Sequence, residues 1–378
     1  MFIPTAHAVQ GSEIRVPQDV ATPREAIVAA HPGDTIVLAA GVYPGGYVVP
    51  RAKHDLTIVG TDRNAVVFAG DDRRRDGIVV RAAGVSILNM SAHNFRRNAF
   101  YWVAANRFRA SYLTAWNVGS YGIYAEDSEH GTIDHDFVSG AGDAAYYVGE
   151  CRPCDTTVSH VVARLSAVGY SGTNATGVLI RDSVFDRNGA GIVPNSYSNE
   201  ALAPEARIRI VSNTIIDSGR ARVPIATALA SFIGIGVAIA GGNDNVVSGN
   251  RILRSERYGV AVFSTARFVS FTPGAPEPGP RWVPRGNRVS RNTVTGSGVA
   301  DLALAQGSGR NNCFERNTAA RTRPLDLQSR RCTAAGDRRV AAELTRRVQD
   351  MVREMHRRRH PPPYRTMPAP PPQPNMRR

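Results

Sequence analysis

Residues 245–263 read Asn245-Val-Val-Ser-Gly-Asn250-Arg-Ile-Leu-Arg-Ser-Glu-Arg-Tyr-Gly259-Val-Ala-Val-Phe263, and most of the chain repeats this stretch. Two short runs of β-branched residues, 246–252 and 259–263, flank a polar turn, and such runs predict short β-strands. Copies of varying strength lie at residues 287–304, 208–219, 177–193, 108–124 and 311–318. A strand-turn-strand unit of this length cannot bury its own apolar face, so it needs a similar unit on each side. The sequence therefore predicts a stack of repeats.

The spacing of the copies indicates the kind of stack. Where no insertion intervenes, a step from a small residue through glycine to a β-branched residue recurs about every 19 to 25 residues, for example from Gly122 to Gly142. The copies alternate and are rich in Val, Ile, Gly and Asn, so they match neither helical repeats nor a leucine framework. The remaining candidate is a parallel β-helix, in which each turn adds a short strand to the preceding one. One repeat position is asparagine in four copies, which predicts an internal column of Asn213, Asn250, Asn292 and Asn317.

The repeats resemble those of right-handed parallel β-helix proteins, the pectin-lyase-like superfamily. That family often begins with a short amphipathic helix, a Pro-Gly-Asp turn, a first strand and a Gly-x-Tyr. Here a candidate helix at residues 20–30 precedes Pro32-Gly-Asp34 and Gly41-Val-Tyr43. The resemblance covers roughly residues 14–335. It implies an all-β fold, a single-stranded right-handed parallel β-helix with a short N-terminal capping helix, and leaves the activity open because one fold hosts many functions.

The two ends of the chain differ in composition from the repeats. Residues 1–13 contain Ala6-His-Ala8, which has the small-x-small form of a cleavage site, so they are either a remnant of an export signal or an ordinary disordered terminus. Fifteen arginines and five acidic residues lie from residue 320 onward, which places ten of the fourteen net positive charges at this end. Residues 336–360 are predicted to form a basic amphipathic helix, and residues 361–378 an extended, disordered proline-rich tail.

The basic helix has two explanations. It can cap the C-terminal end of the stack, since the terminal strand of a solenoid is an exposed edge. Alternatively, it holds the protein to an anionic surface such as a cell-envelope polymer or anionic lipid. Because the repeats themselves carry little net charge, binding of nucleic acid is not expected. The overall expectation is a monomer that is secreted or attached to the cell envelope.

The four cysteines fit an exported protein. Cys151-Arg-Pro-Cys154 lacks the βαβ context of a redox motif, and no second pair follows at zinc-finger spacing, so no metal site is expected there. We expect two local disulfides, Cys151–Cys154 and Cys313–Cys332, although four cysteines allow three pairings and the sequence does not choose among them. No cofactor is expected, while a bound Ca²⁺ is compatible with the sequence.

Acidic, histidine and tyrosine residues concentrate between residues 126 and 150. Within the superfamily, uronate lyases and mannuronan C5-epimerases remove the proton at C5 and need a positive group on the sugar carboxylate, a base and an acid. Asp134-His135-Asp136 resembles the Asp-x-His-Asp motif of the epimerases but is one residue shorter. The candidate catalytic residues are His135, Asp143, Tyr147 and Asp134. The candidate substrate-binding residues are Arg164 and Arg181, whose guanidinium groups can hold a carboxylate.

Each candidate also has a purely structural explanation. Asp136 lies near the repeat position of the asparagines, and Asp143 lies at a Gly-Asp corner, where turn chemistry favours aspartate. Tyr147 is one of two neighbouring tyrosines, of which only one can face outward from a strand. Arg164 and Arg181 can be ordinary exposed arginines on a sheet face.

Two functions from different classes therefore remain. The first is an exported enzyme of the uronate lyase or C5-epimerase type, which acts on an acidic polysaccharide in a lateral groove near residues 134–147. The second is a non-catalytic β-helix that binds glycans or builds a surface layer. No three-aspartate cluster like that of polygalacturonase-type hydrolases is present, so hydrolysis by paired carboxylates ranks lower. A groove that holds His135, Asp143, one tyrosine and an arginine within mutual reach would favour the enzyme, whereas a flat face with these groups scattered would favour the non-catalytic module.

Overall fold

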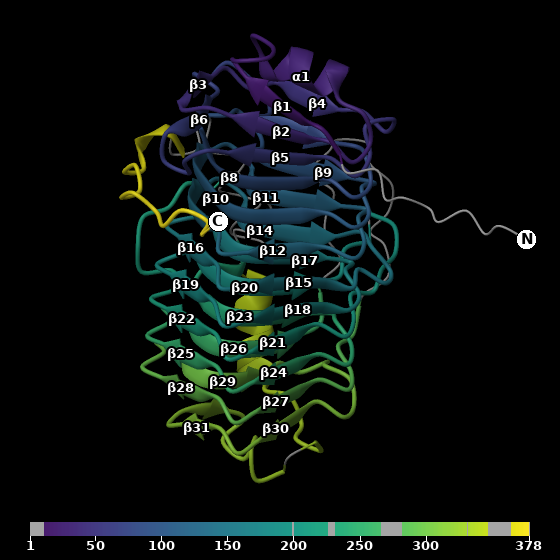
Figure 1. The fold of residues 1–378 in the computed structure, drawn as a ribbon. Helices are drawn as coiled ribbons and strands as arrows, with labels where there is room; N and C mark the ends of the chain where they lie inside the picture. Colours follow the sequence, from purple (N-terminus) through teal and green to yellow (C-terminus); the bar gives the residue numbers. More distant parts are fainter. Residues whose placement is uncertain are drawn as a thin grey trace, which may run out of the picture.

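The computed structural model describes residues 11–198, 200–225, 231–265, 282–330, 332–346 and 364–377. In this part of the chain the strands stack along one axis, and Figure 1 shows successive turns following one another from the N-terminal to the C-terminal end. They form a large sheet of 21 strands and a small sheet of 11 strands. Neighbouring strands pair parallel, with each residue opposite its counterpart one turn away. The fold is an all-β parallel β-helix, which confirms the predicted class.

The large sheet contains two columns of strands, which the long strands β8 (Ser86–His93) and β10 (Arg109–Val118) join. The first column also contains β1 (Glu13–Val16), β2 (Thr35–Leu38), β5 (Thr57–Gly60), β12 (Thr132–Asp134), β15 (Thr156–Ser159), β18 (Val178–Arg181), β21 (Arg209–Val211), β24 (Val246–Ser248), β27 (Arg288–Ser290) and β30 (Cys313–Glu315). The second column also contains β3 (Gly41–Tyr43), β6 (Val66–Ala69), β13 (Phe137–Ala141), β16 (Val162–Arg164), β19 (Val184–Asp186), β22 (Thr214–Ile216), β25 (Arg251–Leu253), β28 (Thr293–Thr295) and β31 (Thr318–Ala319).

The small sheet forms the third side of the β-helix. Its strands are β4 (Tyr47–Val49), β7 (Ile78–Val80), β9 (Phe100–Val103), β11 (Tyr121–Glu126), β14 (Ala144–Gly149), β17 (Val168–Thr173), β20 (Ala190–Asn195), β23 (Ile235–Ala240), β26 (Tyr258–Phe263), β29 (Ala300–Leu304) and β32 (Thr322–Arg323). Each turn therefore passes from the first column to the second and then to the small sheet.

Matching side chains stack inside the β-helix from one turn to the next. One such stack in the first column consists of residues that are each at most 2% exposed: Ile36, Ile58, Ile87, Ala110, Ile133, Val158, Ile180, Ile210, Val247, Val289 and Phe314. Burying one branched aliphatic side chain contributes about 1.5–3 kcal/mol. The β-branched positions of the repeat therefore form the core, as the alternation in the sequence indicates.

The predicted internal asparagine column is present between the first and second columns. The backbone N–H groups of Asn213, Asn250 and Asn292 donate to the side-chain oxygens of Asn250, Asn292 and Asn317, at 2.9, 2.9 and 3.0 Å. The N–H of Asn317 donates to Oε1 of Gln328 at 3.0 Å, which ends the column. Asp136 takes the equivalent position in an earlier turn, because its Oδ1 accepts the backbone N–H of Leu113 at 2.6 Å. These side chains satisfy buried backbone donors at the corner.

The candidate helix at residues 20–30 is present as α1 (Pro23–Ala29), at the purple end of the stack in Figure 1. Thr22 and Glu25 form a capping box at its start, and Pro23 occupies its first turn, where a missing N–H costs nothing. Ile27 is buried against the core, whereas its neighbour Val28 is 70% exposed. In the part of the chain that is described, no helix has both the length and the apolarity needed to cross a membrane.

Both predicted disulfides are formed. Cys151 is bonded to Cys154, and Cys313 is bonded to Cys332 across 19 positions of sequence. The second disulfide ties β30 to the segment that follows β32, so it fastens the last turn of the stack.

The C-terminal helix lies against the side of the stack rather than over its end. Residues 338–346 are helical, and the rest of the predicted helix, 347–360, lies outside the described residues. Val340 and Leu344 are buried against small residues on the outer face of the small sheet, such as Ala238 and Ala261. The expectation of an end cap was wrong, because the apolar face of the helix matches this row of small side chains.

The proline-rich tail also differs from its prediction. Residues 364–377, which begin with a short 3₁₀ helix (η2, Tyr364–Thr366), are extended as expected but lie against the upper turns. Arg365 forms an ion pair with Asp72 at 3.3 Å, and Asn64 forms hydrogen bonds with the backbone of Gln373. The sequence predicted a disordered tail because its composition offers no apolar core; polar side chains of the body hold it instead.

Candidate active site on the small sheet

His135 and Asp134 lie at the corner between the first and second columns. Asp134 ends β12, and His135 occupies the corner with a φ of 58°, in the left-handed region. His135 Nδ1 lies 2.7 Å from Oδ2 of Asp134, and the same oxygen accepts the hydroxyl of Ser111 at 2.9 Å. The imidazole ring stacks between Tyr112 and His160, with centroid distances of 4.7 and 5.0 Å. The corner residues of successive turns thus form a flat aromatic stack on the outside of the β-helix.

Asp143 and Tyr147 lie at the opposite end of the same turn. Asp143 follows β13, and Tyr147 lies in β14 of the small sheet. The five residues of β13 separate this end from His135, a span of about 16 Å for an extended strand. The structure therefore divides the predicted catalytic residues into two pairs instead of bringing them into one groove.

The two predicted substrate-binding arginines lie on different columns of the large sheet. Arg164 ends β16 and its Nε lies 2.9 Å from Oδ2 of Asp186. Arg181 ends β18 and its Nη1 lies 2.6 Å from Oδ2 of Asp182. Each is paired with a neighbouring carboxylate, and neither lies on the small sheet beside Tyr147.

Four tyrosines of consecutive turns meet on the outer face of the small sheet. Tyr101, Tyr124 and Tyr147 lie opposite one another in β9, β11 and β14. The rings of Tyr101 and Tyr124 stack at 4.5 Å with 13° between their planes, and Tyr121 stacks on Tyr124 at 4.3 Å. Tyr147 meets Tyr124 edge-on at 4.8 Å. We call these residues, together with Glu126 and Glu150, the tyrosine–carboxyl surface.

Strand alternation explains why these tyrosines face outward. Tyr146, next to Tyr147, is buried in the core and its hydroxyl donates to the carbonyl of Val162 at 3.0 Å. Of the two neighbouring tyrosines, one thus faces inward and the other outward, as predicted. Tyr147 is 4% exposed, so it packs edge-on beside Tyr124 without offering an accessible ring face. Tyr101, Tyr121 and Tyr124 remain partly exposed and offer the accessible ring faces.

Carboxyl groups border the tyrosines. Tyr101 donates its hydroxyl hydrogen to Oε2 of Glu126, and the Nδ2 of Asn174 donates to Oε1 of Glu150 at 2.9 Å. Burial raises the pKa of Glu150 to about 8 from its ordinary value of 4.5, and a hydrogen bond with Glu200 and the charge of Glu126 act in the same direction. Burial also raises the pKa of Tyr124. At neutral pH, Glu150 is therefore a carboxylic acid that can donate a proton beside the carboxylate of Glu126.

The tyrosines and glutamates of the surface include no cation, but Arg75, paired with Asp76 at 3.5 Å, lies near enough to act against the rise in the pKa of Tyr101. The groups with the largest electrostatic effects on the pKa values of Tyr121, Tyr124, Tyr147 and Glu150 are carboxyl groups and neutral tyrosines. An arrangement of one proton-donating carboxyl, one carboxylate and stacked aromatic rings can bind a sugar and perform acid–base chemistry on it.

Sequence reasoning found Tyr147 but missed Tyr101, Tyr121, Tyr124, Glu126 and Glu150 as members of one surface. A signal was available, because Tyr101, Tyr124 and Tyr147 are separated by 23 residues each, which is one turn of the repeat. Residues at this spacing lie side by side on one face of a parallel β-helix. The prediction instead used the density of acidic and histidine residues along the sequence. Residues that are close in sequence are distributed around one turn of the β-helix and do not share one face.

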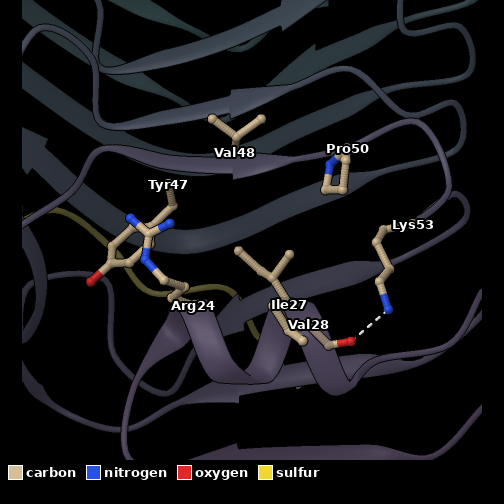
Figure 2. Close-up of a pocket in the computed structure, with 7 residues that line it drawn as sticks. All are labelled: Arg24, Ile27, Val28, Tyr47, Val48, Pro50 and Lys53. Atoms are coloured by element: carbon tan, nitrogen blue, oxygen red, sulfur yellow. Dashed lines mark hydrogen bonds between the residues drawn. The ribbon is translucent and has the colours of Figure 1, made fainter.

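A separate hollow of about 190 Å³ lies between α1 and β4 at the N-terminal end (Figure 2). Lys53 Nζ donates to the carbonyls of Val28 and Ala30 at 2.6 and 2.5 Å, so this lysine caps the C-terminus of α1. The guanidinium of Arg24 lies 5.8 Å from the centre of the Tyr47 ring. The residues that line the hollow include no carboxylate or histidine, so it is not the candidate site for acid–base chemistry. Among the described residues, no group of three or more His, Cys, Asp or Glu side chains is placed to hold a metal ion.

No protein-family model matches the sequence, and no curated protein matches it. Solved structures match in fold. The A-module of the mannuronan C-5 epimerase AlgE4 of Azotobacter vinelandii aligns over 78% of this chain and 88% of its own, with 16% identity and a TM-score of 0.52. The catalytic domain of a GH87 alpha-1,3-glucanase in complex with tetrasaccharides aligns over 85% of this chain and 67% of its own, with 12% identity and a TM-score of 0.51. At these identities the similarity concerns the fold alone.

Proposed function

We propose that the protein binds a polysaccharide along the outer face of the small sheet and acts on it by acid–base chemistry at the tyrosine–carboxyl surface. The observation that carries the proposal is the stacked row of Tyr101 and Tyr124, with Glu126 and Glu150 beside it on adjacent turns. Two proteins of similar fold, the AlgE4 epimerase module and the GH87 alpha-1,3-glucanase domain, act on polysaccharides.

The composition of the surface suits a sugar chain. A pyranose ring has an apolar face of C–H groups and an edge of hydroxyls. The partly exposed rings of Tyr101 and Tyr124 provide flat apolar area with a polar tip, and carboxylates accept hydrogen bonds from hydroxyls. The row follows the axis of the stack, so consecutive sugars of an extended chain can contact consecutive turns.

Within this proposal, Glu150 is the general acid and Glu126 is the base or nucleophile. Glu150 donates its proton to the oxygen that leaves with the departing sugar, while Glu126 activates water or attacks the anomeric carbon. The raised pKa of Glu150, about 8, keeps its proton in place at neutral pH. The members of the surface carry no positive charge, and Arg75, which lies near Tyr101, is paired with Asp76 at 3.5 Å. A neutral polysaccharide therefore fits the surface better than an acidic one.

An acidic polysaccharide remains the second candidate substrate, processed by a uronate lyase or C5-epimerase type of reaction. The observation that favours it is the contact of Tyr101 with the carboxylate of Glu126, since a tyrosine and a carboxylate can serve as acid and base in proton abstraction at C5. In this reaction the protonated Glu150 would donate a hydrogen bond to the substrate carboxylate. The two disulfides support an exported location, where oxidised cysteines persist.

A product assay distinguishes these reactions. The purified protein is incubated with neutral glucans and with uronate polymers, and new reducing ends, the ultraviolet absorbance of unsaturated products and the C5 configuration are measured. We expect new reducing ends without absorbance from a neutral glucan; absorbance or inversion at C5 from a uronate polymer would establish the second candidate. The Glu150→Gln variant should lose activity on the neutral glucan, because an amide cannot serve as the general acid, whereas Glu256→Gln, a change at an exposed glutamate on a lower turn, should retain it. Activity that survives Glu150→Gln would refute the assignment of the acid.

A further inference from the structure

The C-terminal segment occupies a polar site on the upper turns, on the side of the large sheet. In Figure 1 it is the yellow segment beside β3 and β6. Besides Asp72, which pairs with Arg365, the partners of the segment lie in the turn after β5 and at the start and end of the second column. They are Asp62, Arg63, Asn64, Asn89 and Asn117. We call these five residues the strap site. None of them belongs to the tyrosine–carboxyl surface.

The strap site binds the backbone of the segment through hydrogen bonds. The side-chain amide of Asn64 pairs with both backbone groups of Gln373, accepting its N–H at 2.8 Å and donating to its carbonyl at 2.9 Å. Oδ1 of Asn89 accepts the N–H of Met376 at 2.9 Å, and Nδ2 of Asn117 donates to the carbonyl of Met367 at 3.1 Å. The segment is thus held in one register by side-chain amides at both of its ends.

A buried arginine completes the site. Arg63 is 2% exposed, and its Nε and Nη2 donate to Thr114 Oγ1 and to the carbonyl of Leu113 at 2.7 and 2.5 Å. Its remaining nitrogen, Nη1, donates to the carbonyl of Pro374 at 3.1 Å. The segment therefore supplies an acceptor to a charged group that is almost fully removed from water, and such bonds are stronger than neutral ones.

One side chain of the segment adds selectivity. Oδ1 of Asn375 accepts the backbone N–H of Arg63 at 2.6 Å, and its Nδ2 donates to Oδ2 of Asp62 at 3.0 Å. By contrast, the side chain of Gln373 donates within the segment itself, to the carbonyl of Pro371 at 2.8 Å. The site consequently distinguishes residue 375 of the segment by its side chain and residue 373 only by its backbone.

The segment has the properties of a peptide ligand. Residues 367–376 read Met367-Pro-Ala-Pro-Pro-Pro-Gln-Pro-Asn-Met376, and their five prolines fix φ before binding, which lowers the entropy lost on docking. Short proline-rich peptides bind folded domains in this way. The groove also continues past Met376 as a hollow of about 410 Å³ along the outer face of β1, β2 and β5, so the site is open at its end.

From these contacts we propose that the strap site is a peptide-binding site for an extended proline-rich segment ending in Gln-Pro-Asn-Met, and that it accepts this segment from a second copy of the chain as well as from its own. The resident segment has an effective concentration of the order of millimolar because it is tethered. It therefore outcompetes a free peptide at micromolar concentration. Exchange of the resident segment for an added peptide becomes measurable once the contacts of the resident segment are weakened.

The test uses the full chain with Gln373→Pro and Asn375→Ala, which removes the N–H that Asn64 accepts and the side chain that Asp62 and Arg63 contact. The probe is a fluorescent synthetic peptide of residues 364–378, and binding is followed by anisotropy. We expect the weakened chain to bind the peptide at least about tenfold more tightly than the unaltered chain does. Circular dichroism verifies that the body of the weakened chain is folded.

Matched peptides test the register. A peptide with Gln373→Ala keeps the backbone contacts and should bind like the original, whereas a peptide with Asn375→Ala should bind at least about tenfold more weakly. Asn64→Ala, a change at an exposed residue of the body, should weaken binding of the original peptide similarly. The proposal fails if the weakened chain does not bind the peptide at about 1 mM, the effective concentration assumed for the tether, or if Asn375→Ala leaves binding unchanged.

Discussion

Replacing Asn250 by alanine tests the internal asparagine column where it is most complete. Asn250 is 2% exposed. Its Oδ1 accepts the backbone N–H and the side-chain amide of Asn213 at 2.9 and 3.1 Å. Its Nδ2 donates to the carbonyl of Ile210 at 2.8 Å and to Oδ1 of Asn292 at 2.9 Å. Nδ2 also donates to the carbonyl of Ser248 at 3.2 Å. Alanine removes all five of these bonds and leaves the buried backbone N–H of Asn213 without its acceptor.

The expected cost follows from these contacts. A buried donor left unsatisfied costs about 1–3 kcal/mol, and the loss of the other bonds in the column adds to it, so we expect Asn250→Ala to lower the free energy of unfolding by about 3–5 kcal/mol. Urea unfolding followed by far-ultraviolet circular dichroism measures the change. The control is Ser248→Ala, two residues away in β24, which should cost less than about 0.5 kcal/mol. Equal destabilisation by the two changes would refute the column as a source of stability.

Three further predictions concern the acid, the last turn and the helix. Activity should be highest near neutral pH, where Glu126 is ionised and Glu150 protonated, and should fall about tenfold per pH unit well above pH 8, since the pKa of Glu150 is about 8. A rate that rises above pH 8 would contradict the assignment. Replacing Cys313 and Cys332 by serine opens a 19-residue loop and should lower the free energy of unfolding by about 3 kcal/mol, as read from urea midpoints. Glu343→Gln removes the carboxylate that the buried Arg257 contacts at 2.8 Å, and should destabilise docking of the helix by about 2 kcal/mol. Hydrogen exchange of residues 338–346 measures this change. Unchanged exchange would exclude the ion pair as an anchor of the helix.

The fold could be predicted because each repeat carries the same pattern of strand-forming and corner residues. Val247, Asn250 and Ile252 recur at fixed positions in neighbouring copies, and a parallel stack places equal positions in contact. Inward and outward residues then follow from strand alternation, as for Tyr146 and Tyr147. The expected cysteine pairing was found, and it joins the cysteines that lie nearest to each other along the chain.

The candidate site could be predicted only in part, because neighbours on a β-helix surface are one turn apart in sequence. Asp134 and Asp143 are nine positions apart, yet they lie at opposite ends of β13. Tyr101 and Tyr124 are 23 positions apart, yet their rings stack. A dense cluster of reactive residues in the sequence therefore spreads around one turn, while the functional surface is assembled from several turns.

Docking of the tail was beyond sequence reasoning for a related reason. Arg63 and Pro374 are 311 positions apart, and no repeat pattern connects them. The composition of the tail predicts an extended chain, and this was found. Only the arrangement of polar side chains around Arg63 determines that the extended chain has a site to occupy.

Binding of defined oligosaccharides tests most directly the claim that the protein holds a glycan on the small sheet. Calorimetric titration would compare the unaltered chain, Tyr124→Ala and His135→Ala with a neutral α-1,3-glucan hexasaccharide and with a mannuronan hexasaccharide. We predict that Tyr124→Ala weakens binding of the neutral oligosaccharide at least about tenfold, equivalent to about 1.4 kcal/mol, and that His135→Ala leaves it unchanged. Binding that is lost on His135→Ala and retained on Tyr124→Ala would contradict the account and place the glycan at the opposite corner of the β-helix.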